Sequence, residues 1–147
     1  KRYGSLVLKS LPPARISRRF DDTYRFFSSE PFDADYALTA WVNDLDGANQ
    51  YRWQLTRLLD GRTKGDEGFA ETPQQARWQG VLTGVEQLQK AIERGGKQSS
   101  QFKLEIRLPG IAGDAHRILR EGQSDLQNRL SQFKAVHAYT LDNGVGA

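Results

Sequence analysis

The first pattern along the chain is a period-two alternation over residues 5–11, with Leu6 and Leu8 on one side and Ser5 and Val7 on the other. This alternation predicts a short β-strand. A single strand of this length is not stable alone. It must therefore pair with another strand of the chain or with its own copy in a dimer.

Helical spacing follows this strand. Apolar residues recur every three or four positions through residues 14–27, and again in a segment that starts at Asp33 or Asp35, either of which can cap a helix, and ends at Gly47. A third helix is expected over residues 48–60, unless Gly47 is a tolerated interruption within one long helix. The first third of the chain thus predicts one strand followed by helices.

The next signals are a loop and a strongly marked helix. Residues 61–71 contain three glycines and mixed charges and predict a surface loop. Thr72, Pro73 and Gln75 then form an N-terminal capping pattern, and the helix is expected to end at Gly95. Its apolar positions, which should be buried, are Trp78, Val81, Val85, Leu88 and Ile92.

The last third mixes one strand with helical segments. Residues 102–108 alternate strictly between apolar and charged positions, which predicts a half-buried strand whose charged face lies in water. Residues 113–134 have helical spacing, with a restart at Ser124 after Gly122, and residues 135–141 fit either a helix end or a short strand.

These elements predict an α+β fold that is mostly helical. Residues 1–47 form a region with one strand and two helices, and residues 48–147 form a helical body with one or two further short strands. The two parts are either separate regions or one continuous domain, since 147 residues suffice for one ordinary core.

Charge is concentrated at the start of the chain. Residues 1–30 contain seven basic and three acidic residues, and 7 − 3 gives +4, against +3 for the whole chain. An ordinary solubility charge would explain the total, but its concentration at one end favours an anionic partner. The absence of cysteine excludes disulfides and fits a cytoplasmic location, and no apolar run reaches the ~20 residues of a membrane span.

The chain offers few groups for catalysis. His116 and His137 are isolated, without a second histidine or a cysteine at ligand spacing, so neither a metal nor a cofactor is expected. Carboxylates fit solvated helix faces, and no glycine-rich phosphate loop is present. The tryptophans Trp41, Trp53 and Trp78 have the spacing of core residues. The chain is therefore expected not to be an enzyme.

The basic strand suggests a way to bind DNA. If Leu6 and Leu8 face a core, the opposite side chains of two such strands, paired about a twofold axis, form a ribbon that fits a major groove. The candidate DNA-binding residues are Lys1, Arg2, Tyr3, Ser5, Val7 and Lys9.

The order of elements resembles that of ribbon-helix-helix repressors. Residues 5–46 follow the sequence of strand, Pro12-containing turn, helix, break and helix. This resemblance implies a dimer that reads DNA with its ribbon. One departure is that Glu30, Asp33 and Asp35 place negative charge where such proteins anchor a phosphate at a helix N-terminus.

A second resemblance covers more of the chain. The segment Ala14-Arg15-Ile16-Ser17-Arg18-Arg19-Phe20, the segment Phe32-Asp33-Ala34-Asp35-Tyr36-Ala37 and the late Val136-His137-Ala138 are similar to AcaB-type regulators of conjugative plasmids and integrative elements. This resemblance implies a ribbon-helix-helix homodimer that binds DNA upstream of transfer genes. The body after residue 47 would then serve dimerisation or contact with other transcription proteins.

The sequence thus predicts a double-stranded DNA-binding transcriptional regulator that acts as a homodimer. The alternative is a non-enzymatic scaffold or partner-binding protein with a compact α+β fold, in which residues 5–11 pair within the chain with residues 102–108.

Overall fold

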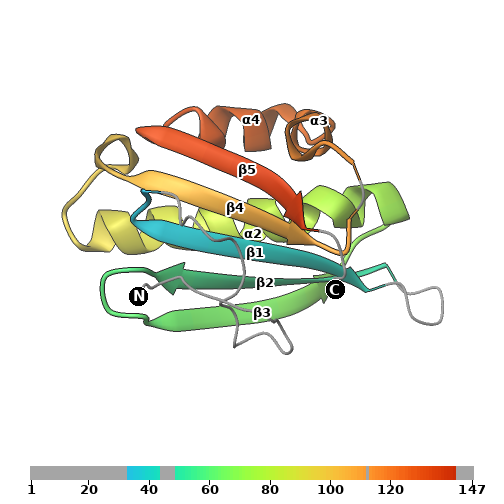
Figure 1. Ribbon diagram of the computed structural model, residues 1–147, viewed down its shortest axis with the longest axis horizontal. Coiled ribbons are helices and arrows are strands. Elements are labelled where there is room, and N and C mark those ends of the chain that lie inside the picture. The colour runs from blue at the N-terminus through green and yellow to red at the C-terminus, as the bar shows by residue number, and fades with distance from the viewer. Residues whose placement is uncertain (1–32, 44–48, 112, 142–147) are drawn as a thin grey trace.

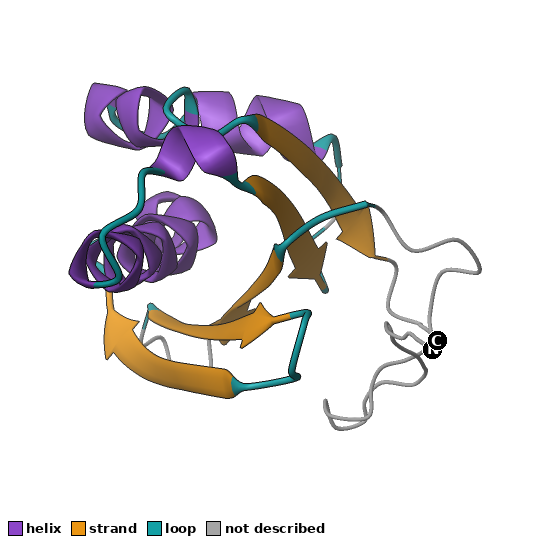
Figure 2. Cartoon of the chain, turned by 90° about the vertical axis from the view of Figure 1, so that its left-hand side faces the viewer, coloured by secondary structure: helices purple, strands orange, loops and turns teal. Residues whose placement is uncertain are grey.

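A computed structural model describes residues 33–43, 49–111 and 113–141, which form a five-stranded mixed sheet with helices on one face (Figures 1 and 2). The strands are β1 (Tyr36–Asn43), β2 (Gln50–Arg57), β3 (Thr63–Phe69), β4 (Lys103–Pro109) and β5 (Ala135–Leu141). The helices are α2 (Pro73–Arg94), the short 3-10 helix η2 (Ser99–Gln101), α3 (Ala115–Arg120) and α4 (Ser124–Leu130).

The strand order across the sheet is β3-β2-β1-β4-β5. The pairs β1–β2 and β2–β3 are antiparallel, whereas β1–β4 and β4–β5 are parallel. Both edges of β4 are therefore occupied by described strands. Because no edge of β4 is left, the predicted alternative in which residues 5–11 pair with residues 102–108 is wrong; residues 5–11 themselves lie outside the described part of the chain.

The prediction of a mostly helical fold is wrong. β1 and β2 replace the two helices expected over residues 33–60, and β3 replaces the expected loop. The ladder pairs Leu38 with Leu55 and Ala40 with Trp53, and all four side chains are buried. The spacing of these residues fits the period of two of a strand as well as the period of a helix, because a short apolar pattern does not distinguish the two.

The two aspartates expected to cap a helix instead bind the start of β4. The Asp35 carboxylate accepts a hydrogen bond from the backbone N–H of Lys103 at 2.8 Å. The Asp33 carboxylate forms an ion pair with the Lys103 ammonium at 2.6 Å, and this pair lowers the pKa of Asp33 and raises that of Lys103. The acidic residues thus stabilise the junction where β1 and β4 begin.

The capping pattern of α2 is confirmed. The Thr72 hydroxyl accepts a hydrogen bond from the backbone N–H of Gln75 at 3.0 Å, and the Gln75 side chain accepts one from the N–H of Glu71 at 3.2 Å. All five apolar positions predicted to be buried in this helix are buried. The predicted restart after Gly122 is confirmed by α3 and α4, and residues 135–141 form strand β5 rather than a helix end.

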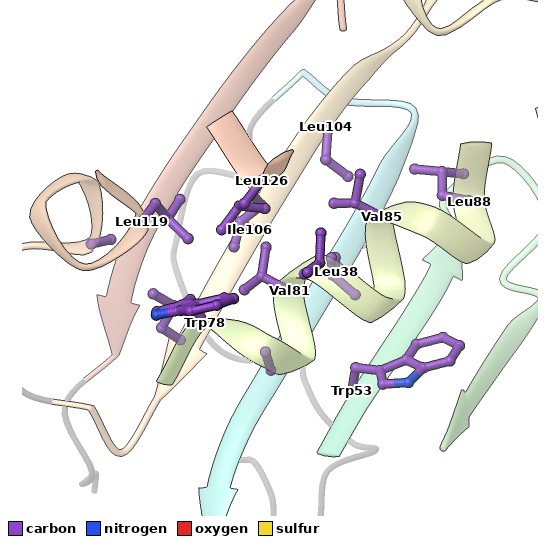
Figure 3. Close-up of a cluster of buried hydrophobic side chains, with 14 of the residues drawn as sticks. Leu38, Trp53, Trp78, Val81, Val85, Leu88, Leu104, Ile106, Leu119 and Leu126 are labelled. Carbon is purple, nitrogen blue, oxygen red and sulfur yellow. The ribbon is translucent and has the colours of Figure 1, made fainter. Parts of the chain in front are cut away.

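The core lies between the sheet and the helices (Figure 3). Two glycines of α2 let this helix approach the central strands closely. A Cβ atom at Gly84 would lie 2.4 Å from Leu38 Cδ1, and one at Gly80 would lie 3.0 Å from the backbone oxygen of Arg52. Larger side chains at these positions would push α2 away from β1 and β2.

A polar contact joins α4 to α2 beside this core. The Arg129 guanidinium donates to Gln89 Oε1 at 2.9 Å, and it lies 3.4 Å from a Glu86 carboxylate oxygen on α2 and 3.2 Å from one of Asp125 on α4. Gln89 is a buried polar residue of α2, so this contact satisfies its carbonyl group.

Some predictions fall outside the described residues. The helix over residues 14–27 is one of them, and the division of the chain into residues 1–47 and 48–147 stays a prediction. Among the described helices, none has both the length and the apolar character needed to cross a membrane.

We predict that Gly84→Ala destabilises the protein by about 1 kcal/mol. Overpacking a closed core costs ~1–3 kcal/mol, which exceeds the ~1 kcal/mol gained from replacing glycine by alanine in a helix. The measurement is the free energy of unfolding in urea. The matched control is Gly95→Ala at the exposed end of α2, where the nearest atom to a new Cβ is 3.5 Å away. A Gly84→Ala variant more stable than the wild type would contradict the close approach of α2.

Candidate functional site

The sheet has one face turned away from the helices, which we call the distal face (Figure 2). Ladder partners share a face of the sheet, and the alternate residues of each strand belong to the core. Side chains on the distal face include Ala37, Thr39 and Trp41 of β1, Arg52, Gln54 and Thr56 of β2, Thr63, Glu67 and Phe69 of β3, Lys103, Glu105 and Arg107 of β4, and His137 and Tyr139 of β5. The distal face is therefore polar and aromatic where the other face is apolar.

A buried carboxylate lies near the middle of this face. Glu105 is 2% exposed, and its carboxylate accepts hydrogen bonds from Arg107 Nε at 2.9 Å and from the Tyr139 hydroxyl at 2.5 Å. Arg107 and Tyr139 are ladder partners on adjacent strands, which places both donors beside the same carboxylate. A buried charge requires such partners, so the cluster of Glu105, Arg107 and Tyr139 is electrically neutral and internally satisfied.

The chemistry of this cluster fixes where its protons lie. Burial of the hydroxyl raises the pKa of Tyr139 well above its ordinary value, and the negative charge of Glu105 raises it further. Tyr139 is therefore a neutral hydrogen-bond donor at physiological pH, and Glu105 is the acceptor.

An aromatic–cationic pair lies on the distal face near the end of β1 and the start of β2. The Arg52 guanidinium carbon lies 5.2 Å from the centre of the Trp41 ring, and the two residues are ladder partners on β2 and β1. Trp41 is half-buried and Arg52 is exposed. Such a cation–π contact holds a planar ring and a positive charge side by side at the surface.

Sequence reasoning missed both features. Trp53 and Trp78 are core residues as predicted, but Trp41 lies on the distal face. The charged face of residues 102–108 was expected to be wet, whereas Glu105 is buried. Both errors have a physical reason: once residues 36–43 form a strand, Trp41 is out of phase with Leu38 and Ala40, and the parallel strand β5 brings Tyr139 beside Glu105.

The other sequence-predicted sites are not brought together. Lys1, Arg2, Tyr3, Ser5, Val7 and Lys9 lie outside the described residues, and their DNA-binding role stays a prediction. His116 is exposed on α3, and His137 lies on β5. Within residues 33–43, 49–111 and 113–141, no three histidine, cysteine or acidic side chains are placed to hold a metal ion.

Comparison with known proteins finds similarity among solved structures. No family model and no curated protein matches the chain. Among solved structures, the chain is similar to RNase H1 from the halophilic archaeon Halobacterium salinarum NRC-1, with 15% identity and a TM-score of 0.44 over 76% of this chain and 87% of that chain. A likeness of this degree transfers no activity or ligand.

Several sequence predictions are corrected by these findings. The ribbon-helix-helix and AcaB-type resemblances are wrong, because residues 36–43, expected to lie in the second helix of that motif, form strand β1 of a five-stranded mixed sheet. The predicted role as a transcriptional regulator loses its basis with them. The prediction that the chain is not an enzyme is not upheld: a solved structure similar to the chain is that of an RNase H1, although a likeness of this degree assigns no activity to this chain.

We predict that Tyr139→Phe destabilises the protein by about 1.5–3 kcal/mol, the usual value of a hydrogen bond to a charged group. The matched control is Tyr51→Phe, which makes the same chemical change where the described residues show no hydrogen bond to the hydroxyl. Urea denaturation at neutral pH measures both variants. Equal stability of the two variants would contradict the contact with Glu105.

The same contact predicts a pH dependence. A group whose pKa is raised in the folded state stabilises the fold below its unfolded pKa and ceases to do so as the pH rises through the folded value. The stability difference between wild type and Tyr139→Phe should therefore be constant up to about pH 10, the ordinary tyrosine pKa, and then shrink. Denaturation curves at about pH 8 and about pH 11 test this, since other titrating groups cancel in the difference.

Proposed function

We propose that the distal face binds single-stranded nucleic acid, with Trp41 stacking on a base and Arg52 contacting the backbone. The observation that carries this proposal is the Trp41–Arg52 pair, with 5.2 Å between the guanidinium and the ring, on a sheet face that bears no described helix. Sheets that bind single strands combine aromatic stacking platforms with positive charge.

The neighbouring residues support this assignment. Gln54 and Thr39 are ladder partners one row along the sheet from Trp41 and Arg52, and they supply uncharged donors and acceptors for base edges. The negative charge of Glu105 is neutralised by Arg107 at 2.9 Å. The charge of Glu105 on β4 is thus paired, and Glu67 on β3 is the acidic ladder partner of Arg52 on the same face.

The proposal keeps nucleic acid as the partner but replaces the predicted double-stranded DNA with a single strand. A double-stranded target read by a ribbon has no support in the described residues. A homodimer through residues 5–11 and a cytoplasmic location remain predictions.

Binding can be measured through intrinsic fluorescence. Trp53 and Trp78 are buried, at 6% and 5% exposure, so a stacking base should quench mainly Trp41. We expect saturable quenching by single-stranded DNA or RNA of about 12 nucleotides, a length within the usual site size, and weaker binding of duplexes of the same sequence. Trp41→Leu should abolish the quenching and weaken binding roughly 5- to 150-fold, since stacking on a base contributes ~1–3 kcal/mol.

The charge is tested separately. Arg52→Gln should reduce the magnitude of the slope of log K against log salt concentration by about 0.7, the value for one phosphate contact to a single strand. Its control is Arg62→Gln, which removes an exposed guanidinium near the far end of the β2–β3 hairpin. Equal effects of the two changes, or unchanged binding in Trp41→Leu, would show that the attraction is diffuse and that the distal face is not the binding surface.

A further inference from the structure

We propose that the outer edge of β3 pairs antiparallel with β3 of a second copy of the chain, in a register centred on Gly65. β3 is the edge strand of the described sheet, next to β2 (Figure 1). Its residues 63–67 and 69 are all exposed. This pairing follows from the geometry of the edge strand and does not depend on the proposed function.

The backbone of β3 offers a regular set of hydrogen-bonding groups at this edge. Residues of an antiparallel pair alternate between hydrogen-bonded and non-hydrogen-bonded partners. The N–H of Arg57 donates to Arg62 O, and the N–H of Ala70 donates to Asn49 O, each at 2.8 Å. These two hydrogen bonds involve the even-numbered residues 62 and 70. Because hydrogen-bonded pairs recur at every second residue, the even-numbered residues of β3 are the ones hydrogen-bonded to β2. The residues that direct both backbone groups outward are therefore Thr63, Gly65 and Glu67.

The side chains select the register. With Gly65 opposite its own copy, each Lys64 lies opposite Asp66 of the other copy, and Thr63 lies opposite Glu67. A register centred on Asp66 would oppose two aspartates, and one centred on Lys64 would oppose two lysines. Lysine on an edge strand ordinarily prevents pairing. In this register, however, Lys64 and Asp66 each lie opposite a side chain of the opposite charge, and they do so in the non-hydrogen-bonded pairs, where side chains are closer.

The exposed apolar side chains fit the same arrangement. Among the described residues, the large hydrophobic side chains that are exposed are Leu59, at 83%, and Phe69, at 67%. In the register centred on Gly65, Phe69 lies opposite Gly61 of the second copy, in the turn that also contains Leu59. The pairing thus brings each Phe69 to the turn that carries the Leu59 of the other copy, and removes apolar surface from water at both ends of the interface.

The symmetry has a consequence for the distal face. Residues directly opposite each other in an antiparallel pair point to the same side, so the twofold axis is perpendicular to the sheet. The two sheets would join edge to edge, and both distal faces would lie on the same side of the dimer.

Analytical ultracentrifugation of the full chain over a range of concentrations tests the pairing. We expect a concentration-dependent dimer for the wild type. Lys64→Asp and Asp66→Lys should each raise the dissociation constant about tenfold or more, because each change sets like charges opposite one another twice in the symmetric interface. The double variant Lys64→Asp/Asp66→Lys should return the dissociation constant to within about threefold of the wild type, because the two reversed pairs are again complementary.

The control is Lys97→Asp, which makes the same charge reversal at an exposed position after the end of α2. Circular dichroism should show unchanged folding in all variants, since Lys64 and Asp66 are exposed. A wild type that is monomeric at every concentration would overturn the proposal. So would a dimer that is insensitive to both single changes, because it would have to form through another surface.

Discussion

The close contact between α2 and the two central strands is the constraint on which the rest of the structure depends. Gly80 and Gly84 lie one helical turn apart and face Ala40 and Leu38 on β1. This spacing lets the helix backbone lie almost directly on the sheet, and the larger apolar residues of α2 then fill the space on either side. The position of α3 and α4 follows from that of α2, since Trp78 packs against Gly122 and Arg129 binds Gln89.

The part of the fold that could be predicted is the part with local signals. The capping residues Thr72 and Gln75 fixed the start of α2, and the strict alternation of residues 102–108 predicted β4. β1 and β2 could not be recognised in this way, because Leu38, Ala40 and Trp53 satisfy both periods and only pairing with distant strands decides between them. Trp41 was assigned to the core for the same reason.

The distal face illustrates why a site of this kind is invisible in one sequence. Trp41 and Arg52 are adjacent because of an antiparallel register, and Glu105 and Tyr139 because of a parallel one. Neither spacing along the chain is a motif. The two clusters also differ in character, since the buried Glu105 is held by two partners, whereas Arg52 remains exposed beside its ring. The first cluster is satisfied within the protein, and the second is the one that we propose contacts nucleic acid.

The parallel pairing of β1 with β4 has a consequence for how the protein folds. Tyr36 meets Leu104 only after β2, β3 and α2 have intervened, whereas the β1–β2 and β2–β3 hairpins need only short loops. Closing a long loop costs more chain entropy and slows folding. The hairpins and α2 should therefore form first, leaving one edge of β1 unpaired until β4 arrives. During that interval an apolar strand edge is accessible to other chains, so refolding yield should fall as protein concentration rises.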